Sequence, residues 1–423
     1  GRLASYDEGA LAAVSVVEDA SGVARLRINN RQQEGSSASR YVDARQAWLP
    51  LLLHPSPRSA LFLGLGTGVT ASAAAADPTL EVDAVELLPE VIAASVHFVP
   101  PADALKSGRL HVVAADARRF VRRAPHRYDV IVSDNFHPAR SGSGALYTVE
   151  HFAAVERRLE PSGVFCQWLP LHQLDLPTLK SIVRSFVTVY PRSYGILANN
   201  SLETPVLGLV ARADQGRFER LALRRRFENP SLPELVTGLG LEDELAVLGS
   251  FVAGPASLEA FAAGAPANTD DRPVVSYRAP RVTYAPAETP ADRLFSWLSA
   301  VSVSPAELLA PAPNSEFPER LLAYWSARQR FIVAGRDVRP SASVANMLAQ
   351  IEGPLLTVLR VSPDFRPAYD PLLSMASSLA RSDVAAARTL LTALAQIQPA
   401  RTEASQLLAA LASAPAATGE STR

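Results

Sequence analysis

Three glycines, Gly64, Gly66 and Gly68, alternate with other residues directly after a short apolar run, and Glu86 closes the next apolar run. Glycines let a backbone turn tightly and approach a ligand closely, and an acid at the tip of the following strand can accept hydrogen bonds from ribose hydroxyls. The pattern predicts a nucleoside-binding strand, turn and helix. Taken alone, the glycines are also compatible with a plain strand-to-helix turn.

Two further acids stand at the ends of apolar runs. Asp116 follows the run 109–115, and Asp134 follows the run 128–133. Either acid by itself could be a helix cap or a solvated loop residue. As a set they indicate a ligand site, because acids at the tips of successive parallel strands converge on the edge of the sheet where doubly wound folds bind ligands.

The elements that must position these residues alternate from about residue 57 to residue 212. Besides the runs above, the periodicity predicts helices at 148–159 and 177–189 and strands at 163–168, 194–198 and 206–210. This alternation is typical of an α/β domain with a mostly parallel sheet covered on both faces. The strand-like runs 14–18 and 23–28 form a β-hairpin, and a helix-like run ends at Leu53.

The chain therefore divides into an N-terminal β-hairpin unit (1–45), a main domain (46–280), a Pro/Ala-rich linker (281–291) and a helical region (292–423). Within the main domain, residues 213–267 are predicted to be a helical insertion and 274–277 a closing strand. In the helical region, the spacing of proline-separated helix pairs is close to the period of about 34 residues of tetratricopeptide repeats. Ordinary helix packing also accounts for the alanines and leucines there.

Composition limits the function. The 423 residues are 48% hydrophobic with a net charge of −1, so no nucleic-acid partner is expected. One cysteine and seven scattered histidines predict no metal site. The nearly uncharged stretch 60–76 holds the glycine turn and is a poor membrane span. Because the chain begins at Gly1, a longer parent protein is expected.

These motifs resemble the spermidine synthase family of aminopropyltransferases, over roughly residues 10–212. Within the family the chain is most similar to bacterial spermidine synthase-like soluble domains that follow transmembrane helices. The resemblance implies a class I S-adenosylmethionine-dependent-methyltransferase-like (Rossmann-like) domain, an N-terminal β-unit and small-molecule substrates. It also implies a homodimer as an expected assembly and a cytoplasmic location, at the inner membrane if such helices are present.

The resemblance also assigns roles to residues. The co-substrate, S-adenosylmethionine or its decarboxylated form, is assigned to Gly64, Gly66, Thr67, Gly68, Glu86 (ribose), Asp116 and Ala117 (adenine). Asp134 matches the first aspartate of the catalytic Asp-Ser-x-Asp-Pro loop, and His137 is the second candidate base. Gln33 and Tyr41 fall where the family places substrate contacts. From their own positions in the chain, Arg140 is a candidate partner for a donor carboxylate, and Tyr147 and Gln167 are expected to line the pocket.

Thr67 and His137 stand where the family has aspartates that attract cationic amines, so selection for a polyamine and for the decarboxylated donor is predicted to weaken. Threonine and histidine tolerate a donor carboxylate better than aspartates do, because like charges close together in a cleft are costly. A sulfonium sulfur is bonded to three carbons, and a nucleophile can attack any of them and displace the sulfur. The product depends on which carbon lies in line with the nucleophile. Attack by an amine on the long arm transfers an aminopropyl-type group and releases methylthioadenosine. An internal nucleophile would instead cleave the donor, and attack at the methyl would transfer a methyl group.

Three functions follow from these observations. The first is an aminopropyltransferase-type enzyme with an unidentified acceptor. The second is an enzyme that cleaves S-adenosylmethionine to methylthioadenosine without an amine. The third is a nucleoside-binding sensor or scaffold with weak catalysis, whose terminal helices bind a partner.

Overall fold

A computed structural model describes residues 1–30, 32–99, 108–283, 286–311 and 315–413. The chain divides into two compact units, Gly1–Pro313 and Asn314–Arg423. The first unit holds two β-sheets, and the second is made of helices in the part of it that the structure describes.

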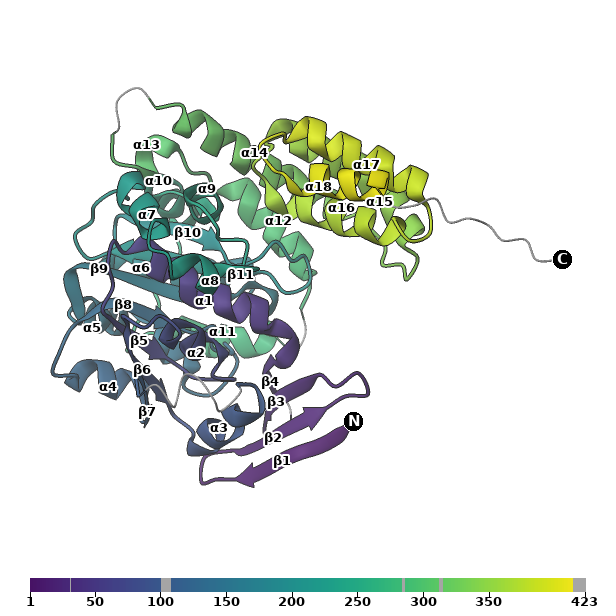
Figure 1. The fold of residues 1–423 in the computed structure, drawn as a ribbon. Coiled ribbons are helices and arrows are strands. Elements are labelled where there is room, and N and C mark those ends of the chain that lie inside the picture. The colour runs from purple at the N-terminus through teal and green to yellow at the C-terminus, as the bar shows by residue number, and fades with distance from the viewer. Residues whose placement is uncertain (31, 100–107, 284–285, 312–314, 414–423) are drawn as a thin grey trace. The chain divides into compact units, whose positions relative to one another are not determined.

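The N-terminal sheet is antiparallel, and its strands follow chain order: β1 (Arg2–Glu8), β2 (Ala13–Glu18), β3 (Ala24–Ile28) and β4 (Gln32–Ser36). The predicted hairpin is the β2–β3 pair, which β1 and β4 extend to four strands. Alternate side chains such as Val14, Val16 and Leu26 are buried against Val91 of α3 (Pro89–Ala94), as Figure 1 shows for the elements. This packing attaches the small sheet to the main domain.

The main sheet has eight strands in the described residues, in the order β12-β10-β11-β9-β8-β5-β6-β7. Their bounds are β5 (Ser59–Leu63), β6 (Glu81–Glu86), β7 (Leu110–Ala114), β8 (Tyr128–Ser133), β9 (Leu159–Pro170), β10 (Ser193–Leu197), β11 (Val206–Arg212) and β12 (Phe251–Ala253). Strands β5 to β9 are parallel to one another, and β11 lies antiparallel between β9 and β10. The predicted α/β, class I methyltransferase-like fold is confirmed.

The remaining helices of the first unit are α1 (Arg40–Leu53), α2 (Val69–Ala75), α4 (Ala117–Arg123), α5 (Val149–Glu156), α6 (Leu176–Val189), α7 (Arg220–Phe227), α8 (Leu232–Val236), α9 (Glu244–Leu248), α10 (Pro255–Ala262), α11 (Val274–Thr283), α12 (Pro290–Ala300) and α13 (Pro305–Leu308). Short 3-10 turns cover Ser37–Ser39, Ser95–His97, Ser143–Tyr147 and Leu171–Gln173. Helices α1 and α2 pack together, as do α5 and α6.

The predicted closing strand at 274–277 is wrong, because these residues begin helix α11. The outer side of β10 is instead paired with β12, which lies inside the predicted helical insertion. The position beside β10 is therefore occupied by residues 251–253. The side chain of Asn268 accepts a hydrogen bond from the backbone N–H of Val275, and so satisfies one donor at the start of the helix.

The predicted linker at 281–291 also differs from the structure, because α11 extends to Thr283 and α12 belongs to the first unit. Trp297 of α12 is buried against Phe261, with ring centroids 4.6 Å apart, and Arg293 donates a hydrogen bond to the Leu174 carbonyl. The division between the units therefore lies near residue 313.

The second unit is a run of helices, each packed on the next: α14 (Phe317–Gly335), α15 (Val344–Val361), α16 (Arg366–Leu379), α17 (Val384–Ile397) and α18 (Glu403–Ser413). This arrangement agrees with the predicted helical region, and the tetratricopeptide resemblance stays a prediction. No helix in the described residues of either unit combines the length and apolar character needed to cross a membrane.

Candidate active site

Two cavities meet at the carboxyl end of the parallel strands. The glycine-loop cavity, of about 350 Å³, lies beside Gly64, Gly66 and Glu86. The α1 cavity, of about 330 Å³, lies beside helix α1. Both are lined by Asp134 and by the two residues Glu34 and Asn135. The two spaces therefore share one wall, as expected where a transfer reaction brings two substrates together.

The glycine turn follows β5 and shapes the first cavity. Gly64 has a φ of 94°, which favours glycine, and a Cβ there would lie 2.8 Å from Cε1 of Phe136. Only glycine lets the loop after β8 come this close. Gly68, also with a positive φ, is the N-cap residue of α2 and lines neither cavity. Thr67 is buried and faces the α1 cavity.

Glu86 ends β6 and is buried at the wall of the glycine-loop cavity. Its carboxylate accepts hydrogen bonds from the backbone N–H groups of Leu65, at 3.1 Å, and Leu88, at 3.0 Å. One side chain thus holds the glycine turn in place and presents a carboxylate to the cavity. This position suits the predicted contact with ribose hydroxyls.

Asp116 and Ala117 line the same cavity. The Asp116 carboxylate also accepts from the N–H of Arg119, so this acid caps α4 as well. The neighbouring Arg118 lines the cavity and donates to both carboxylate oxygens of Asp270, at 2.7 and 2.8 Å. The segment around Asp270 therefore braces this wall.

Asp134 directly follows β8, and its N–H donates to the Leu63 carbonyl. Burial raises the pKa of its carboxyl group to about 6; the N–H of Asn135 opposes the shift, and the charge of Glu86 adds to it. A carboxyl group with such a pKa can exchange a proton near neutral pH. The structure thus gives the predicted catalytic acid a place in both cavities.

Two predicted substrate contacts, Tyr147 and Gln167, line neither cavity. Both side chains are fully buried behind the loop that carries Asp134. The Tyr147 hydroxyl donates to the Phe136 carbonyl, and the Gln167 amide donates to the Asp134 carbonyl at 3.3 Å. These residues hold the backbone of the loop.

His137 is buried and lines the α1 cavity. Burial lowers the pKa of its imidazole, and the charge of Arg140 lowers it further, so the ring is predominantly neutral at neutral pH. Arg140 lines the glycine-loop cavity, where one guanidinium nitrogen lies 3.9 Å from a Glu34 oxygen. His137 and Arg140 therefore belong to different cavities.

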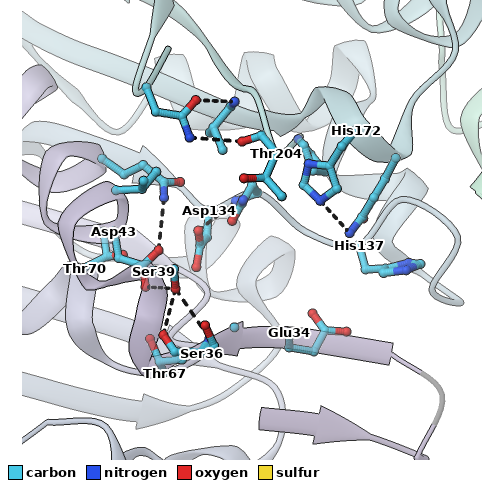
Figure 2. Close-up of a pocket in the computed structure, with 18 of the residues that line it drawn as sticks. Glu34, Ser36, Ser39, Asp43, Thr67, Thr70, Asp134, His137, His172 and Thr204 are labelled. Carbon is cyan, nitrogen blue, oxygen red and sulfur yellow. Dashed lines mark hydrogen bonds between the residues drawn. The ribbon is translucent and has the colours of Figure 1, made fainter. Parts of the chain in front are cut away.

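Two acids that the sequence analysis missed, Glu34 of β4 and Asp43 of α1, line the α1 cavity with Asp134. Burial is the main cause that raises the pKa of each carboxyl group to about 7. The Ser39 hydroxyl donates to Asp43 at 2.9 Å, and Figure 2 shows Asp43 and Glu34 with Asp134 around the cavity. In the described lining there is no lysine or arginine, so this cavity suits a cation.

A sequence signal for Asp43 did exist. Ser39, Asp43 and Gln46 follow one another at intervals of four and three residues and therefore share one helix face, in a helix that is otherwise largely apolar toward its end. A polar stripe of this kind indicates a solvent-filled or ligand-filled space. Glu34 offers no comparable pattern.

The last two predicted contacts lie elsewhere. Gln33 belongs to strand β4, but its side chain is outside the described residues. Tyr41 is 48% exposed, and its ring lies against the Arg45 guanidinium, 5.6 Å from its centroid, away from both cavities. Tyr41 and Asp43 are two residues apart and therefore lie on nearly opposite faces of helix α1. Because Asp43 faces the α1 cavity, Tyr41 faces away from it.

Part of this site lies in a region that is similar to known proteins. Residues 46–195 match the family model of the spermine/spermidine synthase domain. The polyamine aminopropyltransferase of Moorella thermoacetica is 30% identical over 147 residues, which cover 34% of this chain and 52% of that protein. The spermidine synthase of Dictyostelium discoideum is 28% identical over 148 residues, covering 34% and 51% respectively. The chain spans about half the length of the curated relatives it matches.

A crystal structure of spermidine synthase from Thermotoga maritima is similar, with a TM-score of 0.49 and 18% identity, covering 62% of this chain and 87% of that one. The expected fusion to transmembrane helices has no support in these comparisons and stays a prediction. Residues 46–195 of this chain are similar to the spermine/spermidine synthase domain.

Proposed function

We propose that this protein is an aminopropyltransferase that acts on decarboxylated S-adenosylmethionine and a cationic amine and releases methylthioadenosine. The observation that carries the proposal is the pair of cavities that meet at Asp134, one with the nucleoside-type lining and one with three carboxyl groups. The adenosyl part fits the glycine-loop cavity, with Glu86 toward the ribose and Asp116 toward the adenine. The amine fits the α1 cavity.

In this reaction a neutral amine nitrogen attacks the aminopropyl carbon bound to the sulfonium. The new C–N bond forms as the C–S bond breaks, and the electron pair of the broken bond goes to sulfur, which becomes a neutral thioether. Amines are cationic in water, so one proton must leave the nitrogen. We assign this proton to Asp134, because a carboxyl group whose pKa is raised to about 6 can accept a proton near neutral pH.

The carboxyl groups that line the two cavities favour the decarboxylated donor over S-adenosylmethionine. Intact S-adenosylmethionine would bring a further carboxylate close to Asp134 and Glu34, and like charges in a buried space are costly. Thr67 and His137, which replace family aspartates, remove negative charge from the site. Glu34 and Asp43 restore acids to the cavity, so a cationic amine remains the favoured acceptor.

Incubation with each donor, with and without putrescine, tests the proposal when methylthioadenosine and the aminopropylated amine are measured by mass spectrometry. We expect both products only when the decarboxylated donor and the amine are present together. Release of methylthioadenosine from S-adenosylmethionine without amine would instead establish cleavage of the donor without an amine acceptor. A methylated amine would establish methyl transfer.

A further inference from the structure

The segment that joins β10 and β11 forms part of the rim of the α1 cavity, through Asn199, Thr204 and Val206. Figure 2 shows Thr204 at this rim. The Asn199 side chain closes the segment on itself, because its amide donates to the Thr204 carbonyl at 3.0 Å and accepts from the Val206 N–H at 3.3 Å. The rim is therefore a preformed turn that needs an anchor to the rest of the cavity.

Arg45 of α1 provides this anchor. Its Nε donates to the carbonyl of Ala198, next to Asn199, at 2.6 Å. Its Nη1 donates to the carbonyls of Gly240, at 3.1 Å, and Leu239. One guanidinium thus ties helix α1 to the cavity rim and to the segment between α8 and α9.

The surroundings of Arg45 keep its side chain in one place. The Tyr41 ring lies against one face of the guanidinium. Gly240 has a φ of 64°, and a Cβ there would lie 3.1 Å from the Tyr41 hydroxyl and 3.4 Å from Nη1 of Arg45. The Arg45 guanidinium is therefore closely packed against both the Tyr41 ring and Gly240.

We infer that Arg45 is a positioning residue that sets the width of the α1 cavity between Asp43 and the rim at Asn199 and Thr204. Asp43 and Arg45 lie on the same helix, so the helix that presents the acid also holds the opposite wall. The inference rests on the proposed function only for the identity of the ligand as an acceptor amine. Tyr41, predicted to contact substrate, acts instead through Arg45.

The test compares Arg45→Met with Arg226→Met. Arg226 donates to the carbonyls of Leu51 and His54, at 2.7 and 2.9 Å, at the other end of α1, and it lines neither cavity. It is a matched control for losing a guanidinium that holds backbone carbonyls. Arg45→Lys, which keeps the charge and one donor group, is the conservative variant.

Hydrogen exchange followed by mass spectrometry reads the rim directly. In Arg45→Met we expect exchange in residues 199–205 to be about tenfold faster or more than in the parent and in Arg226→Met. With the decarboxylated donor, the KM for putrescine should rise about tenfold while kcat stays within about threefold and affinity for methylthioadenosine is unchanged. Arg45→Lys should recover part of the loss in KM.

The inference fails if Arg45→Met exchanges and turns over like Arg226→Met, because Arg45 would then contribute only to folding. If the parent protein turns over no amine, the proposed function fails instead. In that case the exchange measurement still decides whether Arg45 holds the rim.

Discussion

Asp134 lines both cavities, and its raised pKa suits a group that takes a proton from an amine near neutral pH. Asparagine has nearly the same shape but cannot accept that proton. We therefore expect Asp134→Asn to lower methylthioadenosine release by about 10²-fold or more. Affinity for methylthioadenosine, measured by calorimetry, should change little.

His137→Ala separates the two candidate bases, because His137 lines the α1 cavity without reaching the glycine-loop cavity. We expect this variant to retain most of its kcat. An inactive His137→Ala beside a fully active Asp134→Asn would assign the proton to the histidine and remove the catalytic role from Asp134.

Asp43 makes amine binding depend on pH. Its pKa is raised to about 7, so the carboxylate that attracts a cation is only partly formed at pH 6 and largely formed at pH 8. The KM for putrescine should therefore fall from pH 6 to pH 8 in the parent. In Asp43→Asn it should be about tenfold higher at pH 8 and vary less with pH. Steady-state kinetics across this range measure both effects.

The same carboxyl group lowers stability as pH rises. Its pKa is about 7 in the folded protein against 3.8 as the ordinary value, so the folded state binds more protons between these limits. The free energy of unfolding then falls as pH increases through this window. We expect Asp43→Asn to raise the melting temperature more at pH 8 than at pH 5, by calorimetry. An equal change at both pH values would contradict the shifted pKa.

At the level of elements, the turn between β5 and α2 brings the loop after β8 against the strand end. In Gly64→Ala the new Cβ would lie 2.8 Å from the Phe136 ring and 3.1 Å from Cβ of Asp134, at a strained backbone angle. We expect affinity for methylthioadenosine to fall about tenfold or more, because displacement of this loop distorts the cavity wall.

Gly238→Ala is the matched control, since Gly238 has a φ of 75° but its Cβ would meet nothing within 4 Å. The backbone strain alone should cost about 1–2 kcal/mol of stability and leave nucleoside affinity unchanged. Equal losses of affinity in the two variants would show that strain, and not the contact with the loop, controls binding.

At the scale of the whole chain, the boundary between the units predicts which truncation preserves the site. A protein ending at residue 313 keeps α12 and α13, including buried Trp297 and Arg293 with its hydrogen bond to the Leu174 carbonyl. We expect it to fold and to bind methylthioadenosine like the full chain, by calorimetry.

A protein ending at residue 289 is the control, because it loses Trp297 from its contact with Phe261 and exposes apolar surface. Loss of a large buried aromatic side chain costs about 3–5 kcal/mol of stability. The melting temperature of this protein should therefore fall by several degrees or more. If the protein ending at 313 stayed folded but could not bind, the second unit would belong to the site.

The sequence by itself determined several of the parallel strands and several of the residues that line the glycine-loop cavity. Short apolar runs define β5, β6 and β8, and the carboxyl ends of parallel strands must share an edge. Glu86 and Asp134 are therefore brought together by patterns that are local in the chain. The glycine turn is equally local, because it depends on the backbone angles of its own residues.

Tertiary structure decided how the other half of the site is assembled. Glu34 and Asp43 come from segments ahead of the main domain, and their convergence on Asp134 depends on how the small sheet and α1 pack. Tyr147 and Gln167 lie behind the loop, where their side chains donate hydrogen bonds to the Phe136 and Asp134 carbonyls. Residues 274–277 form the start of helix α11, while β12 takes the place beside β10. Which face a side chain presents, and what fills the space opposite it, depends on contacts between distant segments, and residue spacing does not encode those contacts.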